Sequence, residues 1–208
     1  RRTLIRGIHA HSEAGAAYMA DGYARVTGRP GICMAQIIGA LNLCAGLRDA
    51  HLAKSPIIAL TGGREANHRD RWAYQEVDDI PAFAPYTKMN AVVDDPARLP
   101  DMLRQAFRVA TTGSPGPVHL QLAGNTGQAI ENAEIVFDGV IEAQYGQVPP
   151  DRPQPDLNKV REAAKRISEA RRPVIVAGGG VKYSGAYEAL NKLADAMHVP
   201  VATSLNAK

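Results

Sequence analysis

The residue of this sequence best placed to do chemistry is Glu13. It follows Ser12, a favourable N-cap, at the start of a stretch with helical periodicity, where the helix dipole favours a carboxylate. An ordinary capping acid would occupy the same position. The small residues at 14–17 (AGAA) permit close packing with little water. A carboxylate desolvated in this way could hold or share a proton near neutral pH, so Glu13 is a candidate acid–base group.

A run of glycines at residues 178–180 is the second feature that could serve a ligand. It follows an expected strand and precedes an expected helix, as a dinucleotide-binding turn would. The last glycine of G-x-G-x-x-G would fall at position 183, where Tyr183 stands. The run therefore indicates a tight turn, with a phosphate-facing loop as the alternative. The sequence contains neither GxxxxGK[ST] nor GxSxG, which excludes a P-loop nucleotidase and an α/β-hydrolase.

Histidines and cysteines form no metal-binding pattern in the sequence. His9 and His11 flank the first expected turn without a carboxylate or cysteine at ligand spacing, and His68 lies in a polar stretch. Cys33 and Cys44 have apolar neighbours and no CxxC spacing, which indicates buried free thiols in a reducing cytoplasm. We therefore expect a cytoplasmic protein and no metal ligands in this chain.

The elements that must position these residues alternate short apolar runs with helical stretches. This pattern is typical of an α/β fold, in which a parallel sheet is flanked by helices. In the first part of the chain we expect strands at residues 3–9, 32–36, 57–61, 89–93 and 118–122, and helices at 13–27, 40–54 and 97–111. A second, incomplete α/β domain repeats the pattern with helices at 157–170 and 186–198 and strands at 173–177 and 199–203.

Composition places the chain among soluble globular proteins. Hydrophobic residues make up 45% of its 208 residues and charged residues 22%, which is enough to build a core. The net charge of +3 without a dense basic run and the aromatic content of 5% argue against nucleic-acid binding. No apolar run approaches the roughly 20 residues that cross a bilayer, so no membrane partner is expected.

A proline-rich segment predicts a domain boundary. The apolar pattern weakens from Ala123 onward, and Pro149, Pro150, Pro153 and Pro155 crowd the end of the segment. We interpret residues 126–155 as a linker between a first domain, 1–125, and a second domain, 156–208. The chain has no initiator Met and no terminal cap, so we expect the first domain to be truncated at its N-terminus and the second at its C-terminus.

A series of motifs runs along nearly the whole chain. Residues 11–28 read HSEAGAAYMADGYARVTG. They are followed by GALNL at 39–43, SPIIALTG at 55–62, YQEVD at 74–78, GSPGPV at 113–118 and RPVIVAGGGV at 172–181. In this order the motifs resemble those of one family, the thiamine-diphosphate enzymes of the acetohydroxyacid synthase and pyruvate oxidase group, whose first segment reads HEqgAaxmAdGYARaTG.

The resemblance implies which parts of the family's architecture are present. Residues 1–125 would be most of a pyrimidine-binding (Pyr) domain without its first strand and helix, and residues 156–208 would begin the central domain. The family's diphosphate-binding (PP) domain, which holds Mg²⁺ and the diphosphate with a GDG…N motif, has no counterpart in the sequence. The family's site forms between domains of two subunits, which implies a homodimer or homotetramer, and this chain alone is expected to be inactive.

The resemblance also implies roles for five residues. Glu13 would be the catalytic glutamate that hydrogen-bonds the aminopyrimidine ring of thiamine diphosphate and so promotes loss of the thiazolium proton. Gly39 and Asn42 would bind the cofactor at the pyrimidine edge. Gln75 would be the second catalytic residue, near the reacting carbon, with Tyr74 beside it as a further cofactor-binding residue.

Two departures from the family's pattern affect the expected substrate. Residues 36–39 read QIIG where the family usually has SGPG, so an apolar pair should reshape the wall of the site. Residues 122–125 read LAGN where acetohydroxyacid synthases usually have a lysine. We therefore expect a C–C lyase or carboligase acting on a 2-oxo acid or a diketone, as cyclohexane-1,2-dione hydrolase does. FAD binding is left open, and the alternative is a non-catalytic dimerisation or regulatory module.

Overall fold

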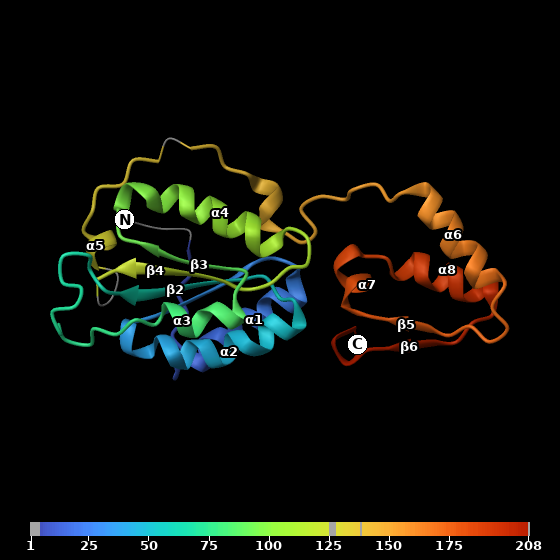
Figure 1. Ribbon diagram of the computed structural model, residues 1–208, viewed down its shortest axis with the longest axis horizontal. Helices are drawn as coiled ribbons and strands as arrows, with labels where there is room; N and C mark the ends of the chain where they lie inside the picture. The colour runs from blue at the N-terminus through green and yellow to red at the C-terminus, as the bar shows by residue number, and fades with distance from the viewer. Residues whose placement is uncertain (1–4, 125–127, 138, 208) are drawn as a thin grey trace. The chain divides into compact units, whose positions relative to one another are not determined.

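The chain forms two units of structure, unit 1 (Arg1–Pro150) and unit 2 (Asp151–Lys208). The computed structural model describes residues 5–124, 128–137 and 139–207 (Figure 1). Both units contain parallel strands accompanied by helices, so the expected α/β class is confirmed.

The centre of unit 1 is a four-stranded parallel sheet with the order β1-β2-β4-β3. Its strands are β1 (Gly31–Ala35), β2 (Ile57–Gly63), β3 (Met89–Val93) and β4 (Val118–Ala123). β2 and β4 lie inside the sheet and are almost wholly buried, as expected of parallel strands covered on both faces. β1 is an edge strand, and its side chains alternate between buried and exposed.

Helices cover both faces of this sheet (Figure 1). α1 (Glu13–Thr27), α2 (Ala40–Ala53) and α3 (Ile80–Phe83) lie on one face, and α4 (Leu99–Thr111) lies on the other. Each face has its own apolar cluster, one around Leu43, Leu47 and Phe83 and the other around Val118 and Leu120. The short elements of the unit are α5 (Gln128–Glu131) and the 3₁₀ turns η1 (Ile37–Gly39), η2 (Ala84–Tyr86), η3 (Pro96–Arg98) and η4 (Ala143–Gly146).

The ends of α1 follow from its sequence. The Ser12 hydroxyl accepts a hydrogen bond from the backbone N–H of Gly15 at 3.1 Å, which satisfies one of the unpaired donors of the first turn. The helix ends at Gly28, whose φ of 68° is the left-handed conformation that glycine adopts without strain. These signals explain why the predicted bounds, 13–27, agree with the observed ones.

The expected strand at residues 3–9 is wrong for the residues that the structure describes. Residues 5–10 have no regular secondary structure, and Ile5 and Ile8 are largely exposed. A strand persists only as part of a sheet, and residues 5–10 belong to neither of the two sheets. Thr3 and Leu4 lie outside the described residues.

Part of the segment interpreted as a linker packs on unit 1. The backbone N–H of Val148 donates to the carbonyl of Gly28 at 2.7 Å. Glu142 forms an ion pair with Arg108 of α4, whose guanidinium also lies 5.7 Å from the ring centre of Tyr145. The described residues up to Pro150 therefore belong to unit 1, and the change of unit falls within the prolines.

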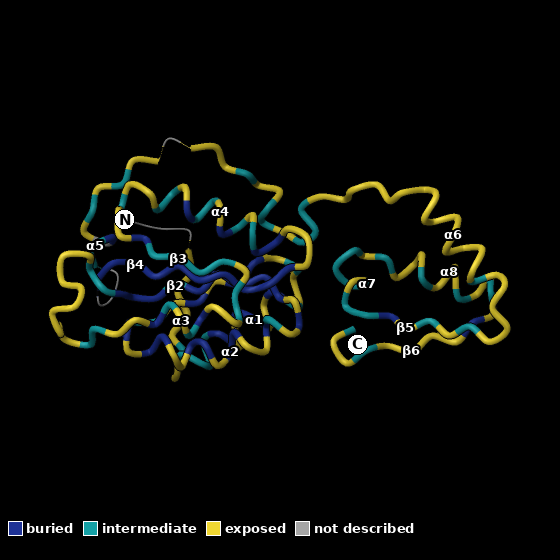
Figure 2. The backbone as a smooth tube through the Cα atoms, in the orientation of Figure 1, coloured by how far each residue is buried: buried dark blue, intermediate teal, exposed yellow. Residues whose placement is uncertain are grey.

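Unit 2 has a pair of parallel strands, β5 (Ile175–Ala177) and β6 (Val201–Thr203). Its helices are α6 (Leu157–Ser168), α7 (Gly179–Ser184) and α8 (Tyr187–Met197), and it ends in the 3₁₀ turn η5 (Leu205–Ala207). Figure 2 shows few buried positions here; among the described residues of the unit, only Ala177 and Val199 are buried.

A buried polar network lies in the sheet beneath α3. His119 on β4 is fully buried, its ring is stacked on Phe83 at 3.7 Å, and its Nε2 and Nδ1 lie 2.8 Å from Thr61 Oγ1 and Asn90 Oδ1. Burial lowers the pKa of His119 to about 3. The ring is therefore neutral in the folded protein at all but strongly acidic pH.

We expect His119 to make the protein sensitive to acid. Its folded pKa of about 3 lies below the ordinary value of 6.5, so its contribution to stability is complete above pH 6.5 and decreases as the pH falls towards 3. Between pH 7 and pH 5 the wild type should lose about 2 kcal/mol more free energy of unfolding than His119→Gln. Urea denaturation at both pH values measures this, with the exposed His68→Gln as control. Equal losses in the wild type and His119→Gln would contradict it.

Candidate functional site

The candidate site lies where β1 and β2 end, at the carboxyl edge of the parallel sheet. Open α/β sheets bind ligands at this edge. After β1 the chain passes through Gln36 and η1 into α2, and after β2 it enters a long polar loop, residues 64–79. α1 begins beside η1, because Glu13 at its start contacts Gly39 at the end of η1.

Glu13 lies against Gly39 and is held by Asn42. A Cβ added to Gly39 would lie 2.6 Å from Cγ and Oε1 of Glu13, so only glycine leaves room for this carboxylate. Asn42, in the first turn of α2, donates from Nδ2 to Glu13 Oε2 at 3.3 Å. The carboxylate is half-buried rather than enclosed. The structure thus brings three of the sequence-predicted site residues into contact.

Gln75 and Tyr74 form a second group in the loop after β2. Gln36 donates from Nε2 to Gln75 Oε1 at 2.6 Å, and Gln75 donates from Nε2 to the Tyr74 hydroxyl at 3.2 Å. Tyr74 itself is exposed. Gln36 immediately precedes η1 and Gly39 ends it, so this single turn joins the two groups.

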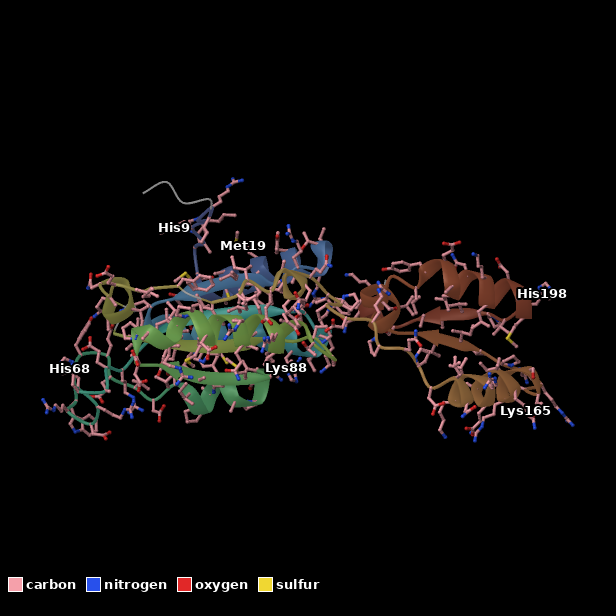
Figure 3. All side chains as sticks on the ribbon, turned by 90° about the horizontal axis from the view of Figure 1, so that it is seen from above. His9, Met19, His68, Lys88, Lys165 and His198 are labelled. Carbon is pink, nitrogen blue, oxygen red and sulfur yellow. The ribbon has the colours of Figure 1, made fainter. Side chains whose placement is uncertain are left out.

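Glu76 organises the loop that carries Gln75. Its carboxylate accepts hydrogen bonds from the backbone N–H groups of Asp70 at 2.6 Å and Ala73 at 3.0 Å. Desolvation raises the pKa of Glu76, but these hydrogen bonds and the nearby Arg64 charge outweigh it and lower the pKa below its usual range. Figure 3 shows His68 at the outer end of the same loop, away from the sheet. Glu76 therefore acts as a brace for an otherwise exposed loop.

The thiols and histidines offer no alternative centre. Cys33 and Cys44 are free and buried, and burial raises the pKa of Cys33 to about 12. Neither is therefore an activated thiolate. Within the described ranges no cluster of histidine, cysteine and carboxylate side chains could hold a metal ion. The helices of the same described ranges are too short or too polar to cross a membrane.

Sequence reasoning missed the roles of Gln36 and Glu76. Both residues stood inside motifs, but what they do depends on how the loop of residues 64–79 folds back, and a motif does not show this. The only local signal for Gln36 was its place directly after a predicted strand, where parallel folds put ligand-binding residues.

The fold is that of an α/β domain with a carboxylate at the carboxyl edge of its parallel sheet, and comparison with known proteins identifies its family. A family model described as "Thiamine pyrophosphate enzyme, N-terminal TPP binding domain" matches residues 1–82, the range that contains all five predicted site residues. Another, "Thiamine pyrophosphate enzyme, central domain", matches residues 160–208. The chain therefore belongs to the thiamine pyrophosphate enzymes.

Curated relatives agree with this family. The chain is 38% identical to the "Probable acetolactate synthase large subunit" of Methanocaldococcus jannaschii, over 99% of this chain and 34% of that protein. It is 36% identical to the "Acetolactate synthase large subunit" of Corynebacterium glutamicum, over 99% of this chain and 32% of that protein. The chain thus spans about a third of the length of these relatives.

The solved structure of benzoylformate decarboxylase from Polynucleobacter necessarius shares the fold. Its TM-score against this chain is 0.76 at 22% sequence identity, with 94% of this chain and 35% of that one covered. At this identity the likeness establishes the architecture alone, and it agrees with the parallel sheets described above.

Because Glu76 braces the loop of residues 64–79, replacing its carboxylate should make this loop easier to cleave. Glu76→Gln should leave the fold intact but remove the acceptor for either Asp70 or Ala73 and weaken the other, because an amide has a single acceptor oxygen and accepts less strongly than a carboxylate. Trypsin should then cleave after Arg69 and Arg71 about five times faster, as expected from a loss of about 1 kcal/mol. Mass spectrometry of the digest measures the rates.

A matched control for the brace is Glu65→Gln, in the same loop. This variant loses only the ion pair with His68, at 3.6 Å, which is weak because it is partly exposed and because His68 must be protonated to carry charge. Equal cleavage rates in the two variants would contradict the role of Glu76.

Proposed function

We propose that this chain is part of a thiamine-diphosphate-dependent C–C lyase or carboligase that acts on a 2-oxo acid or a diketone. The observation that carries the proposal is the Glu13 carboxylate, held by Asn42 over Gly39 within the part of the chain that matches the TPP-binding domain. The acetolactate synthase relatives support a 2-oxo acid as the substrate class.

The residues at this site fit the pyrimidine end of the cofactor. Such a ring is flat and has an edge nitrogen that can share a proton with a carboxylate. Glu13 supplies the carboxylate, and the side chains of Ile38 and Leu41, both more than half exposed, supply apolar surface on the same turn and the helix that follows it. The donor set of a carboxylate, an amide and apolar surface is the one that such a ring requires.

Each residue then has a definite task. When bound, thiamine diphosphate supplies an acidic carbon and an electron sink for breaking or forming the C–C bond. Glu13 would hold or release a proton at its Oε1, while Asn42 donates to Oε2 and fixes the carboxylate. Gln75 and Tyr74 supply an amide and a hydroxyl that orient the reacting carbonyl.

The wall beside the site favours a substrate larger than the smallest 2-oxo acids. Ile37 and Ile38 follow Gln36 directly, with Ile37 buried and Ile38 60% exposed. A branched apolar side chain at this turn favours an apolar substituent on the substrate. The LAGN segment at 122–125, which lacks lysine, also speaks against authentic acetolactate synthesis. Asn125 lies outside the described residues.

The other parts of the proposed cofactor site would come from domains outside this chain. Mg²⁺ and the diphosphate would be held by a PP domain on another subunit of a homodimer or homotetramer, and the present chain alone would be inactive. FAD would bind through a complete central domain. The buried free thiols Cys33 and Cys44 support the cytoplasm as the location.

Replacing the glutamate tests the proposal directly. In the whole protein, Glu13→Gln should lower turnover of pyruvate or a larger 2-oxo acid by about 100-fold or more, because an amide cannot hold and release the proton. Steady-state rates with thiamine diphosphate and Mg²⁺ measure this. Glu188→Gln, in the exposed first turn of α8, is the matched control and should keep full activity. A loss of less than threefold in Glu13→Gln would refute the role.

A wild-type protein with neither turnover nor binding of thiamine diphosphate would favour the alternative, a non-catalytic dimerisation or regulatory module. Isothermal titration calorimetry with the cofactor and Mg²⁺, together with a panel of 2-oxo acids and diketones, decides between the two.

Gly39→Ala tests the geometry of the site without disturbing the fold. The backbone of Gly39 is ordinary, with φ −87° and ψ −3°, so alanine adopts it without strain. The new methyl group would displace the flexible end of Glu13, and turnover should fall at least tenfold while the melting temperature changes by no more than a few degrees. The control is Gly22→Ala in α1, where a Cβ has nothing within 4 Å. Similar turnover in the two variants would contradict this placement of Glu13.

A further inference from the structure

Gln75 has an unusual backbone conformation for its residue type. It occupies the third position of a turn closed by the N–H of Glu76 and the carbonyl of Ala73 at 3.0 Å, and its φ is 61°. Glycine or asparagine usually takes this position, because a larger side chain is strained there. Strained residues persist where surrounding contacts hold them, and they concentrate at functional sites.

The contact that holds the Gln75 side chain comes from the end of a strand of the central sheet. Gln36 follows directly on β1, whose whole length pairs with β2. Its side chain does not cap η1, and it reaches across 39 positions of sequence to the Gln75 amide. Both side chains are half-buried, and the bond of 2.6 Å is short for a neutral pair.

The direction of this bond decides what the Gln75 amide offers to a ligand. A glutamine amide can turn by half a rotation, which exchanges its oxygen acceptor and its NH₂ donor. Because Gln36 donates to Oε1, the oxygen is occupied and the NH₂ group points the other way. One N–H meets the Tyr74 hydroxyl, and the other meets no acceptor among the residues that the structure describes, so it remains to donate.

We propose that Gln36 is a positioning residue that fixes the orientation of the Gln75 amide, so that Gln75 presents an N–H donor to the carbonyl or carboxylate oxygen of the substrate. The proposal rests on the proposed function and adds to it how the chain recognises the substrate's oxygen. Gln36 touches no substrate in this scheme and acts only through Gln75.

A double-mutant cycle in the whole protein tests this dependence. Gln36→Leu should lower kcat/KM about tenfold, because Gln75 then loses its fixed orientation. In a Gln75→Ala background, the same change should have less than a twofold effect, because the group that Gln36 orients is absent. A general structural role would lower the rate in both backgrounds. Equal losses in the two backgrounds therefore overturn the proposal.

The isosteric variant Gln36→Glu supplies a pH readout. Above its pKa the new carboxylate can only accept, so it should turn the Gln75 amide over and present oxygen to the substrate. When protonated it can donate to Oε1 again. The ratio of variant to wild-type kcat should therefore rise at least threefold as the pH is lowered from 8 to 5. Gln105→Glu, exposed on α4, is the matched control and should give a constant ratio. A constant ratio in Gln36→Glu as well would overturn the proposal.

Trypsin cleavage in the loop separates failure of this inference from failure of the proposed function. Gln36→Leu should speed cleavage after Arg69 and Arg71 whether or not the protein is an enzyme, because the loop loses a tie to the sheet. Faster cleavage in Gln36→Leu, together with no turnover in the wild type, would refute the proposed function but support the contact between Gln36 and Gln75. Activity that depends on Glu13, with unchanged cleavage in Gln36→Leu, would refute the positioning role alone.

Discussion

The approach of α1 to β1 and α2 at backbone distance is the constraint on which the candidate site depends. A Cβ on Gly31 would lie 2.2 Å from the carbonyl oxygen of Ala20, and one on Gly46 would lie 2.5 Å from the Cβ of Ala17. Larger residues would push α1 outward and would move its first residue, Glu13, off Gly39. The position of the Glu13 carboxylate thus depends on small residues that let α1 pack closely against its neighbours, with no space for a larger side chain.

Much of the fold could be predicted because its signals are local. A capping serine and a closing glycine bound the helix at 13–27, and the strand at 89–93 has the bounds that its apolar run indicates. The strand expected at 3–9 failed for the described residues, because an apolar run shows that a segment can pair but not that a partner is present. The four-residue helices α3 and α5 were missed, since one turn is too short to show periodicity.

The residues of the candidate site can likewise be divided into those with a local sequence signal and those without one. Glu13, Gly39 and Asn42 stand at the starts of helices or in a turn, within motifs that follow the family's order. The resemblance therefore predicted their places, and the structure brings Glu13 into contact with the other two. The bonds made by Gln36 and Glu76 could not be predicted. They depend on a loop in which Asp70, Trp72 and Gln75 all have positive φ. Positive φ is usually predicted from a glycine, and none of these three residues is glycine. Such a loop is shaped by its contacts rather than by its sequence.

Trp72 gives this loop a property of its own. It is the only tryptophan among the 208 residues, and 95% of its surface is exposed. The indole emission of this chain therefore originates a few residues from Gln75 and is bathed in water. Any ligand or neighbouring surface that covers the loop would shift that emission to shorter wavelength. The fluorescence of Trp72 can therefore report directly on the loop of residues 64–79, whose conformation the candidate site requires.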